Sequence, residues 1–270
     1  MMMGTRTLHV LAIALGASVA AAQAPDPKAL VGQMKAALEP AKSSARIATL
    51  TVTGDGSSNQ VVLGQARGTA RGGKQILTVV LAPADLRGTA YLVKEEPASD
   101  NDKLWIWIPA IGRVRTVVSP EAYSAFLNSD YTYSDLGFVS LRPTYKSVKD
   151  ETVGGTKAYV IDGEPQQKWY YTRIVTTIAA ATSLPIDRKF YDPANQLWKV
   201  ETFAKVAVID GVPTVMTTKM DDIQSKNSST LNVTDVRYDV DIPAGLLEPM
   251  GLPKAASSPL WASLKGAPAK

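Results

Sequence analysis

The residue types that most often do chemistry in proteins are scarce in this 270-residue chain. It has no cysteine, and its single histidine, His9, lies within the first 22 residues, which are typical of a secretory signal that is cleaved on export. The mature chain therefore lacks the nucleophile systems that need Cys or His, the usual ligand sets of zinc, copper and haem, and any disulfide. We expect it to hold no metal and no other cofactor.

Carboxylates are the remaining candidates for catalysis. The sequence has two obvious acidic clusters, Asp100-Asn101-Asp102 and Asp221-Asp222. Each is explained without a catalytic role if it lies in a turn or at a solvated strand end. A glycosidase pair meets only in the folded chain, so a carboxylate-dependent hydrolase stays open as an alternative; it predicts a polar cleft with two facing acids. The sequence has no G-x-S-x-G, S-x-x-K, P-loop or G-x-G-x-x-G motif. We therefore expect that the protein is not an enzyme.

The signal also predicts where the protein works. Arg6 is the positive charge near the start, and residues 8–19 form the apolar run. Ala20-Ala21-Ala22 provides the small residues of a cleavage site. We expect cleavage after Ala22 and a mature chain free in the periplasm, because no cysteine is available for lipidation. The net charge of +4 for the whole chain is too small to indicate nucleic-acid binding.

The elements that must position any site are mostly strands. Residues 27–42 predict an amphipathic helix with Leu30, Val31, Met34 and Leu38 on one stripe. About a dozen β-rich runs follow, separated by Gly-, Asp- and Asn-rich turns, and their short, regular spacing favours antiparallel meanders. The runs are 46–53, 60–69, 74–82, 88–95, 103–109, 112–118, 157–162, 172–179, 185–191, 196–209, 213–221 and 228–238.

One segment, 119–142, interrupts the strands. Ser119-Pro120-Glu121 resembles a helix start, and Ser134-Asp135 would begin a second short helix. Four aromatic residues need a place to pack in this otherwise polar connection: Phe126, Tyr131, Tyr133 and Phe138. They would either plug the open side of a curved sheet or form a movable lid over a ligand.

The strand 103–109 is apolar on both faces. Alternation places Leu104, Ile106 and Ile108 on one face and Trp105 and Trp107 on the other. Each face must therefore be covered, either by another layer of the core or by an apolar ligand in a cavity.

Two later pairs of residues leave similar alternatives open. Met216 and Met220 share a face of one strand, where thioethers either line an adaptable pocket or fill core gaps. Arg113 and Arg115 share a face of the strand after the tryptophans. They would contact phosphate or carboxylate, or simply face water.

An ordered set of short motifs resembles the outer-membrane lipoprotein-sorting family, and more narrowly its Lol-carrier-like branch of exported proteins. Residue 128 departs from the family's usual glycine, but asparagine tolerates a positive φ better than most residues. The motifs are Arg87-Gly88-Thr89-Ala90-Tyr91-Leu92-Val93, Leu104-Trp105-Ile106-Trp107-Ile108-Pro109, Arg113-Val114-Arg115, Phe126-Leu127-Asn128-Ser129-Asp130-Tyr131 with Tyr133-Ser134-Asp135-Leu136, Leu184-Pro185 with Phe190-Tyr191-Asp192, Ile209-Asp210-Gly211 and Ile242-Pro243.

The resemblance implies a mainly β fold: an unclosed antiparallel β-barrel of about eleven strands, with helices covering the open side. It implies one lipid-binding domain over 23–252, and we expect residues 253–270 to form a flexible tail. In the Lol carriers, the apolar space between sheet and helices receives acyl chains, and about 0.8 kcal/mol per buried CH₂ holds such a chain. No bond is made or broken.

The function that follows is a periplasmic carrier that moves a lipid or lipoprotein between the inner and outer membranes. Its partners would be an inner-membrane transporter, for example a lipid exporter of the resistance-nodulation-division type, and an outer-membrane acceptor. The alternative from another class is an envelope assembly factor that acts by docking to a protein. Arg113 and Arg115 are candidates for headgroup or partner contact. The expected lipid-binding set is Tyr91, Trp105, Trp107, Phe126, Tyr131, Phe138, Met216 and Met220.

Overall fold

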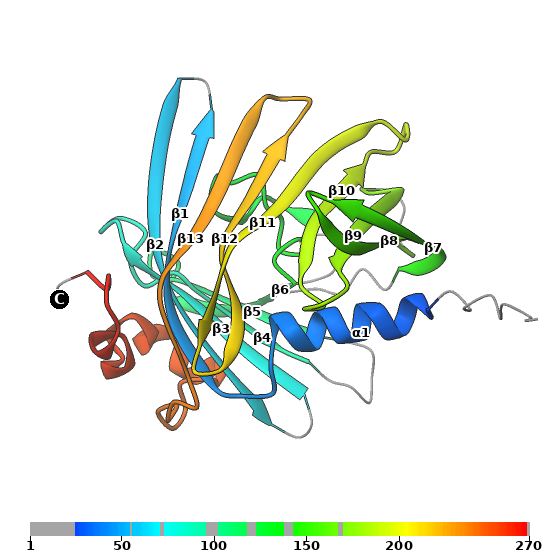
Figure 1. Ribbon diagram of the computed structural model, residues 1–270. Helices are drawn as coiled ribbons and strands as arrows, with labels where there is room; N and C mark the ends of the chain where they lie inside the picture. The colour runs from blue at the N-terminus through cyan, green and yellow to red at the C-terminus, as the bar shows by residue number, and fades with distance from the viewer. Residues whose placement is uncertain are drawn as a thin grey trace, which may run out of the picture.

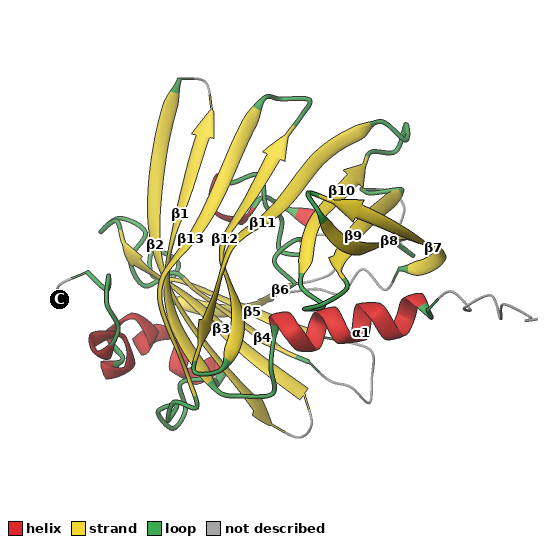
Figure 2. Ribbon diagram, in the orientation of Figure 1, coloured by secondary structure: helices red, strands yellow, loops and turns green. Residues whose placement is uncertain are grey.

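The computed structural model describes residues 25–54, 56–70, 73–95, 102–117, 123–137, 143–166 and 170–268, and β-strands dominate it (Figure 2). Thirteen strands form a single antiparallel sheet. The strands are β1 (Ser44–Gly54), β2 (Ser57–Ala70), β3 (Gly73–Ala82), β4 (Ala90–Lys94), β5 (Lys103–Ile108), β6 (Arg113–Val117), β7 (Thr144–Val153), β8 (Thr156–Glu164), β9 (Arg173–Ala179), β10 (Pro185–Tyr191), β11 (Leu197–Ile209), β12 (Val212–Asp222) and β13 (Asn227–Tyr238).

The order of the strands confirms an unclosed barrel. Strands pair with their neighbours in the chain except at the middle, where β1 pairs with β13, so that β6 and β7 are the two edges. The strand that the sequence pattern missed is β7. Its residues are mostly polar, and those whose burial is described are at least partly exposed. This is usual for an edge strand, and it leaves no apolar alternation in the sequence.

The sheet bends around α1 (Pro27–Leu38), which lies across its open side (Figure 1). The helix starts where the sequence predicted, because the Asp26 side chain accepts hydrogen bonds from the amides of Lys28 and Ala29, both at 3.2 Å. It ends at Leu38, earlier than expected, since Pro40 disfavours a helical conformation at Glu39. Leu30, Val31 and Met34 bury this helix against Ile161 and Ile178 of β8 and β9.

The two faces of the sheet carry separate cores. Leu104 and Ile106 belong to the concave core, together with Leu50 and Leu63 of β1 and β2. The convex core contains alternate residues of the same strands. Its buried members are Ala45, Ile47, Ala66, Leu77, Val79, Leu81, Ala90, Leu92, Leu246, Leu247, Leu252, Ala255, Leu260, Trp261 and Leu264.

The C-terminal segment is packed, which corrects the expectation of a flexible tail from Pro253. Two 3₁₀ helices, η3 (Pro249–Ser257) and η4 (Pro259–Ser263), lie on the convex side, away from α1 (Figure 1). Trp261 is 4% exposed and donates its indole N–H to the carbonyl of Ala255 at 2.7 Å. Its ring contacts the backbone at Gly64, where an added Cβ would lie only 3.0 Å from ring atoms. The absence of a side chain at Gly64 lets the C-terminal segment approach the sheet.

The segment between the two halves of the sheet is described over 123–137. It holds one short 3₁₀ helix, η2 (Phe126–Asn128), and Asn128 has the positive φ of 58° that its side chain tolerates. The second helix expected from Ser134-Asp135 is instead a turn over 133–137, because the Asp135 side chain accepts a hydrogen bond from the amide of Thr132 and folds the chain back. The helix start expected at Ser119 and the aromatic Phe138 lie outside the described residues.

Candidate functional site

Two adjoining cavities occupy the concave side of the sheet, each of about 200 Å³. The first lies among β1, β2, β11, β12, β13, the end of α1 and the segment 123–137, and its apolar walls include Leu50, Leu63 and Val233. The second lies under α1, against β8 to β10. Five residues line both and mark the place where the cavities meet: Leu38, Glu39, Asp135, Gly137 and Arg188.

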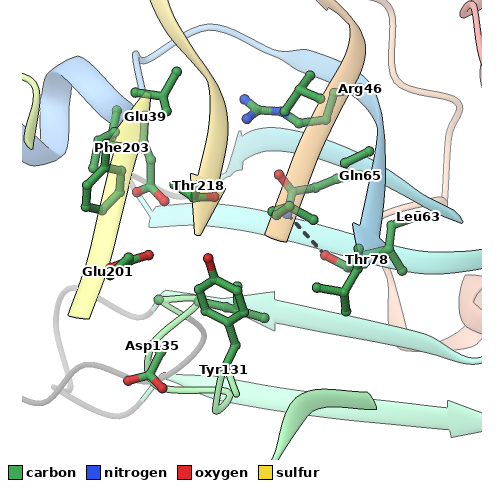
Figure 3. A pocket seen from close by; sticks show the side chains of 18 of the residues that line it. Glu39, Arg46, Leu63, Gln65, Thr78, Tyr131, Asp135, Glu201, Phe203 and Thr218 are labelled. Atoms are coloured by element: carbon green, nitrogen blue, oxygen red, sulfur yellow. Dashed lines mark hydrogen bonds between the residues drawn. The ribbon is translucent and has the colours of Figure 1, made fainter. Parts of the chain in front are cut away.

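A row of polar side chains crosses the first cavity. Arg46 on β1 lies opposite Gln65 on β2, which lies opposite Thr78 on β3. Directly paired residues in an antiparallel sheet point to the same face, so all three line the cavity (Figure 3). The Gln65 amide donates to the Thr78 hydroxyl at 3.2 Å and accepts from Arg67 Nε at 3.1 Å. No such bond holds Arg46, whose buried Nε has no hydrogen-bond partner among the described residues.

The carboxylate of Glu39 ties the end of α1 to the sheet. It pairs with Lys74, and one oxygen lies 3.7 Å from Arg67. Burial alone would raise the pKa of Glu39, but Arg67 and Lys74 together lower it below its usual value. Glu39 is therefore an ionised, neutralised part of the wall.

A second carboxylate, Glu201 on β11, points into the cavity (Figure 3). Only 4% of Glu201 is exposed, and its nearest cation is Arg188 on β10, at 3.4 Å. Burial raises the pKa of Glu201 to about 7, against the opposing effect of Arg188. This group therefore titrates near neutral pH.

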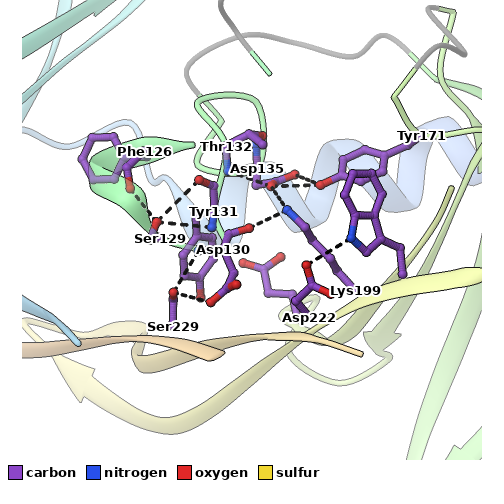
Figure 4. Close-up of polar contacts among 12 residues, drawn as sticks. Phe126, Ser129, Asp130, Tyr131, Thr132, Asp135, Tyr171, Lys199, Asp222 and Ser229 are labelled. Carbon is purple, nitrogen blue, oxygen red and sulfur yellow. Dashed lines mark hydrogen bonds and ion pairs between the residues drawn. The ribbon is translucent and has the colours of Figure 1, made fainter. Parts of the chain in front are cut away.

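The segment 123–137 is latched to the sheet by hydrogen bonds (Figure 4). The Ser229 hydroxyl donates to the Asp130 carboxylate at 2.6 Å, and the Asp130 amide donates back to it at 2.9 Å. Lys199 Nζ donates to the Asp130 carbonyl at 2.6 Å. These bonds hold the aromatic residues of the segment against the concave core.

Asp135 forms the other half of the latch. Its carboxylate accepts the Thr132 amide at 2.8 Å and the Tyr171 hydroxyl at 3.0 Å, and it lies 3.9 Å from Lys199 Nζ. Burial raises the pKa of Asp135, while Lys199 and these donors oppose the rise. So many contacts favour the plug, rather than the movable lid, as the role of the described part of this segment.

The structure brings together four of the residues expected to bind lipid. Tyr91, Phe126, Tyr131 and Met220 are buried in the concave core, and the ring centroids of Tyr91 and Phe126 are 5.0 Å apart. Phe126 and Tyr131 line the first cavity, whereas Tyr91 and Met220 lie in the core outside its lining. Contact of any of them with lipid stays a prediction.

Trp105 and Trp107 require a correction, because they do not face the cavity. They pack against the convex core, and the Leu104 and Ile106 face of the same strand is the concave one. The alternation was predicted correctly, but the choice of face was wrong. The reason is the C-terminal segment, which covers the convex face and was expected to be free.

The other expected residues lie apart from the cavities. Met216 is half-buried on β12 and lines neither of the two, while Arg113 and Arg115 are exposed on the edge strand β6.

Sequence reasoning missed the polar residues of the cavity. A signal for Arg46 was present, since 46, 48 and 50 alternate along β1 and the other two are Ala48 and Leu50. An arginine in an apolar period-two face points inward with them. Glu201 and Arg188 show no comparable signal, because Arg188 lies between Asp187 and Lys189, and Glu201 alternates with another charged residue, Lys199.

The Asp221-Asp222 cluster has a structural explanation. Asp222 accepts the indole N–H of Trp198 at 3.1 Å and the amides of Gln224 and Ser225 in a turn, and Asp221 pairs with Lys219. Asp102 is described, but Asp100 and Asn101 are not. The described residues hold no group of three or more His, Cys, Asp or Glu side chains suited to a metal.

Comparisons with known proteins place this fold. The structure of a domain assigned as an outer membrane lipoprotein-sorting protein from Vibrio parahaemolyticus is 25% identical, with a TM-score of 0.76 over 83% of this chain and 97% of that one. A DUF1329 family protein from Desulfovibrio piger is 23% identical, with a TM-score of 0.75 over 83% and 96%. A LolA superfamily protein from Nitrosomonas europaea is 16% identical, with a TM-score of 0.65 over 82% and 96%.

No curated protein matches the chain. Among the described residues, no helix is long and apolar enough to cross a membrane. A protein-family model with the description "-like: Uncharacterized protein" matches residues 72–254. The chain therefore belongs to this uncharacterized-protein-like family, and it has the open half-barrel fold of LolA-superfamily and outer-membrane lipoprotein-sorting proteins.

Proposed function

We propose that this protein is a periplasmic carrier that binds an acyl chain in the two concave cavities and moves its lipid between the inner and outer membranes. The observation that carries the proposal is the pair of adjoining cavities between an open sheet and α1. A pocket of this kind shields a chain from water, and each buried CH₂ contributes about 0.8 kcal/mol. The fold shared with a protein assigned to lipoprotein sorting supports this role.

The mature chain would reach the periplasm through the expected signal in residues 1–22 and would make no covalent change to its cargo. An inner-membrane transporter, such as a resistance-nodulation-division lipid exporter, and an outer-membrane acceptor are the partners that this role requires. Of the alternatives, the assembly factor calls for a filled interior, which the two cavities do not favour. The hydrolase calls for two acids facing an open cleft, whereas Asp135 is held by Thr132 and Tyr171.

The test begins with the protein purified from its periplasm without detergent. Native mass spectrometry and organic extraction should find a stoichiometric lipid. An uncharged fluorescent probe, the methyl ester of cis-parinaric acid, should then bind the delipidated protein, and the protein should speed transfer of labelled lipid between donor and acceptor vesicles.

A matched pair of variants locates the binding. Val233→Trp places a large ring in the wall of the first cavity and should abolish probe binding. Val208→Trp makes the same change at a residue that is 70% exposed, and it should bind like the unmodified chain. A lipid-free protein that does not bind the probe would overturn the carrier and favour the assembly factor.

A further inference from the structure

We propose that the preferred cargo is a single-chain amphiphile with an anionic head, and that Arg46 binds this head inside the first cavity. The inference rests on the proposed function and names the ligand class of the same site. Its basis is one arginine, its neighbours and the size of the space.

Arg46 is the cation of the first cavity that has no carboxylate within ion-pair distance, and Glu39 attracts it from further away. Glu39 pairs with Lys74 and Arg67, Glu201 with Arg188, and Asp135 with Lys199. These are all the carboxylates that line the first cavity. By contrast, Arg46 forms no hydrogen bond or ion pair with the described residues, and its Nε is buried.

Arg46 is half-buried, and its Nε is shielded from solvent without a hydrogen-bond partner. Burial and the nearby Arg67 lower the pKa of Arg46, against the opposing effects of Tyr238 and Glu39, and an arginine side chain stays protonated at neutral pH. A polar atom that is removed from water is normally hydrogen-bonded. A carboxylate or phosphate oxygen on the ligand would supply that partner, and a guanidinium binds such oxyanions through two parallel hydrogen bonds.

A second unpartnered donor faces the same space. Tyr131 is 1% exposed, and its buried hydroxyl, near Thr218, forms no hydrogen bond of good geometry with the described residues. Figure 3 shows this hydroxyl rising into the cavity from the segment 123–137, with the Arg46 guanidinium entering from the opposite wall. An anionic head between them would satisfy both groups, whereas an uncharged acyl chain would satisfy neither.

The size of the space favours one chain over several. Each cavity holds about 200 Å³, and the two meet at residues shared by their walls. Small-molecule pockets usually enclose roughly 300–1,000 Å³, so the combined space lies at the lower end of that range. A head at Arg46 would leave the apolar walls for a single tail.

The experiment compares cis-parinaric acid with its methyl ester, which has the same tail without the charge. At pH 7.5 we expect the delipidated mature protein to bind the acid about 10-fold or more tightly than the ester, as a charge-assisted hydrogen bond provides. Arg46→Met should reduce this ratio to about one and leave ester binding within about twofold. Tyr131→Phe should lower the ratio by a smaller factor, and Arg46→Lys should retain part of it.

Arg237→Met is the matched control. It makes the same change on β13, opposite Ala45 of the convex core, and the ratio should stay unchanged. Because the variant removes a charge that has no ion pair, Arg46→Met should not have a lower thermal midpoint than the unmodified protein. Arg46→Gln repeats the test if the first variant does not fold. Displacement of the acid probe by palmitate or by a single-chain lysophosphatidate distinguishes a carboxylate head from a phosphate head.

The outcomes separate the two proposals. Equal binding of acid and ester, or a preference that survives in Arg46→Met, would overturn the anionic head and leave the acyl-chain carrier standing. Failure of the unmodified protein to bind the ester and the acid would overturn both.

Discussion

The latch between Lys199 and the segment 123–137 gives the sharpest test of how the cavity is built. Lys199 is 4% exposed, and its ammonium donates to the Asp130 carbonyl and lies 3.9 Å from the Asp135 carboxylate. Lys199→Met keeps much of the side chain's volume but leaves Asp135 buried without its cation. Breaking a buried pair in this way costs about 3–5 kcal/mol, and we expect the free energy of unfolding to fall by that amount.

A double-mutant cycle separates the pair from its surroundings. Asp135→Asn removes the charge but keeps an oxygen that can accept from Tyr171. Alone, this change leaves the Lys199 ammonium unpaired in the same way. In the double variant neither charge remains, so its cost should be smaller than the sum of the two single costs by about 1–3 kcal/mol.

Urea unfolding at pH 7.5 measures these free energies, and hydrogen exchange at the amides of 126–137 reports whether the segment loosens. Lys219→Met is the control, because the Lys219 side chain is 44% exposed and pairs with Asp221 at 2.6 Å. An exposed pair contributes roughly 0–1 kcal/mol. A cost below about 1 kcal/mol for Lys199→Met, or additive single costs, would refute the latch as a buried charge network.

Three further expectations concern stability. Burial raises the pKa of Glu201 to about 7, above its ordinary 4.5, so the native chain retains a proton that the unfolded chain releases. The free energy of unfolding should therefore fall as the pH rises from about 4.5 to about 7, by at most about 3 kcal/mol. Urea unfolding at a series of pH values should show a smaller fall in Glu201→Gln, and an equal fall in the variant would contradict the raised pKa. Trp261→Ala should cost about 3–5 kcal/mol and expose the tail to limited proteolysis, whereas a tail that does not stabilise the sheet would leave the thermal midpoint unchanged. Asn128→Ala should cost about 1 kcal/mol in thermal unfolding, because its φ of 58° disfavours a Cβ without a local hydrogen bond, while Asn128→Gly should cost less, and equal costs would argue against backbone strain there.

Much of the scaffold follows from local patterns in the sequence. Strand 103–109 shows strict alternation, and both of its faces are indeed covered. Asp26-Pro27 marks the start of α1, because an Asp cap and a proline at the first helical position satisfy or avoid the free amides there. Features of this kind depend only on residues that are close together in the sequence. They can therefore be predicted without information about the rest of the fold.

The C-terminal segment shows a local signal that helix and strand patterns do not contain. Buried residues recur every three positions at Leu252, Ala255, Ser258, Trp261 and Leu264, and Leu260 is buried in addition. A 3₁₀ helix has three residues per turn, so this spacing places one stripe against the sheet. The segment is also rich in prolines and small residues, a composition typical of disordered chains, and this composition led to the expectation of a flexible tail. The same error explains the wrong face for Trp105 and Trp107. Tryptophans can lie on the convex face only if another segment covers them, and here the C-terminal segment does so.

The cavity itself depends on contacts that no short pattern contains. Asp135 and Lys199 are 64 positions apart in the numbering but form one buried pair, and Arg46 lies beside Gln65 only through the register of β1 and β2.

Most of the charge in the cavity is explained by structure, and the exception is what points to function. Glu39 fixes the end of α1, and Lys199 with Asp135 fixes the segment 123–137. If all of the charges served only to hold the fold, Arg46 would also have a protein partner, because a charged group with a buried, unpartnered Nε destabilises the chain. A site that binds a ligand keeps such a group at the expense of stability. The same side chain should therefore weaken the empty protein and stabilise it once an anionic amphiphile is bound.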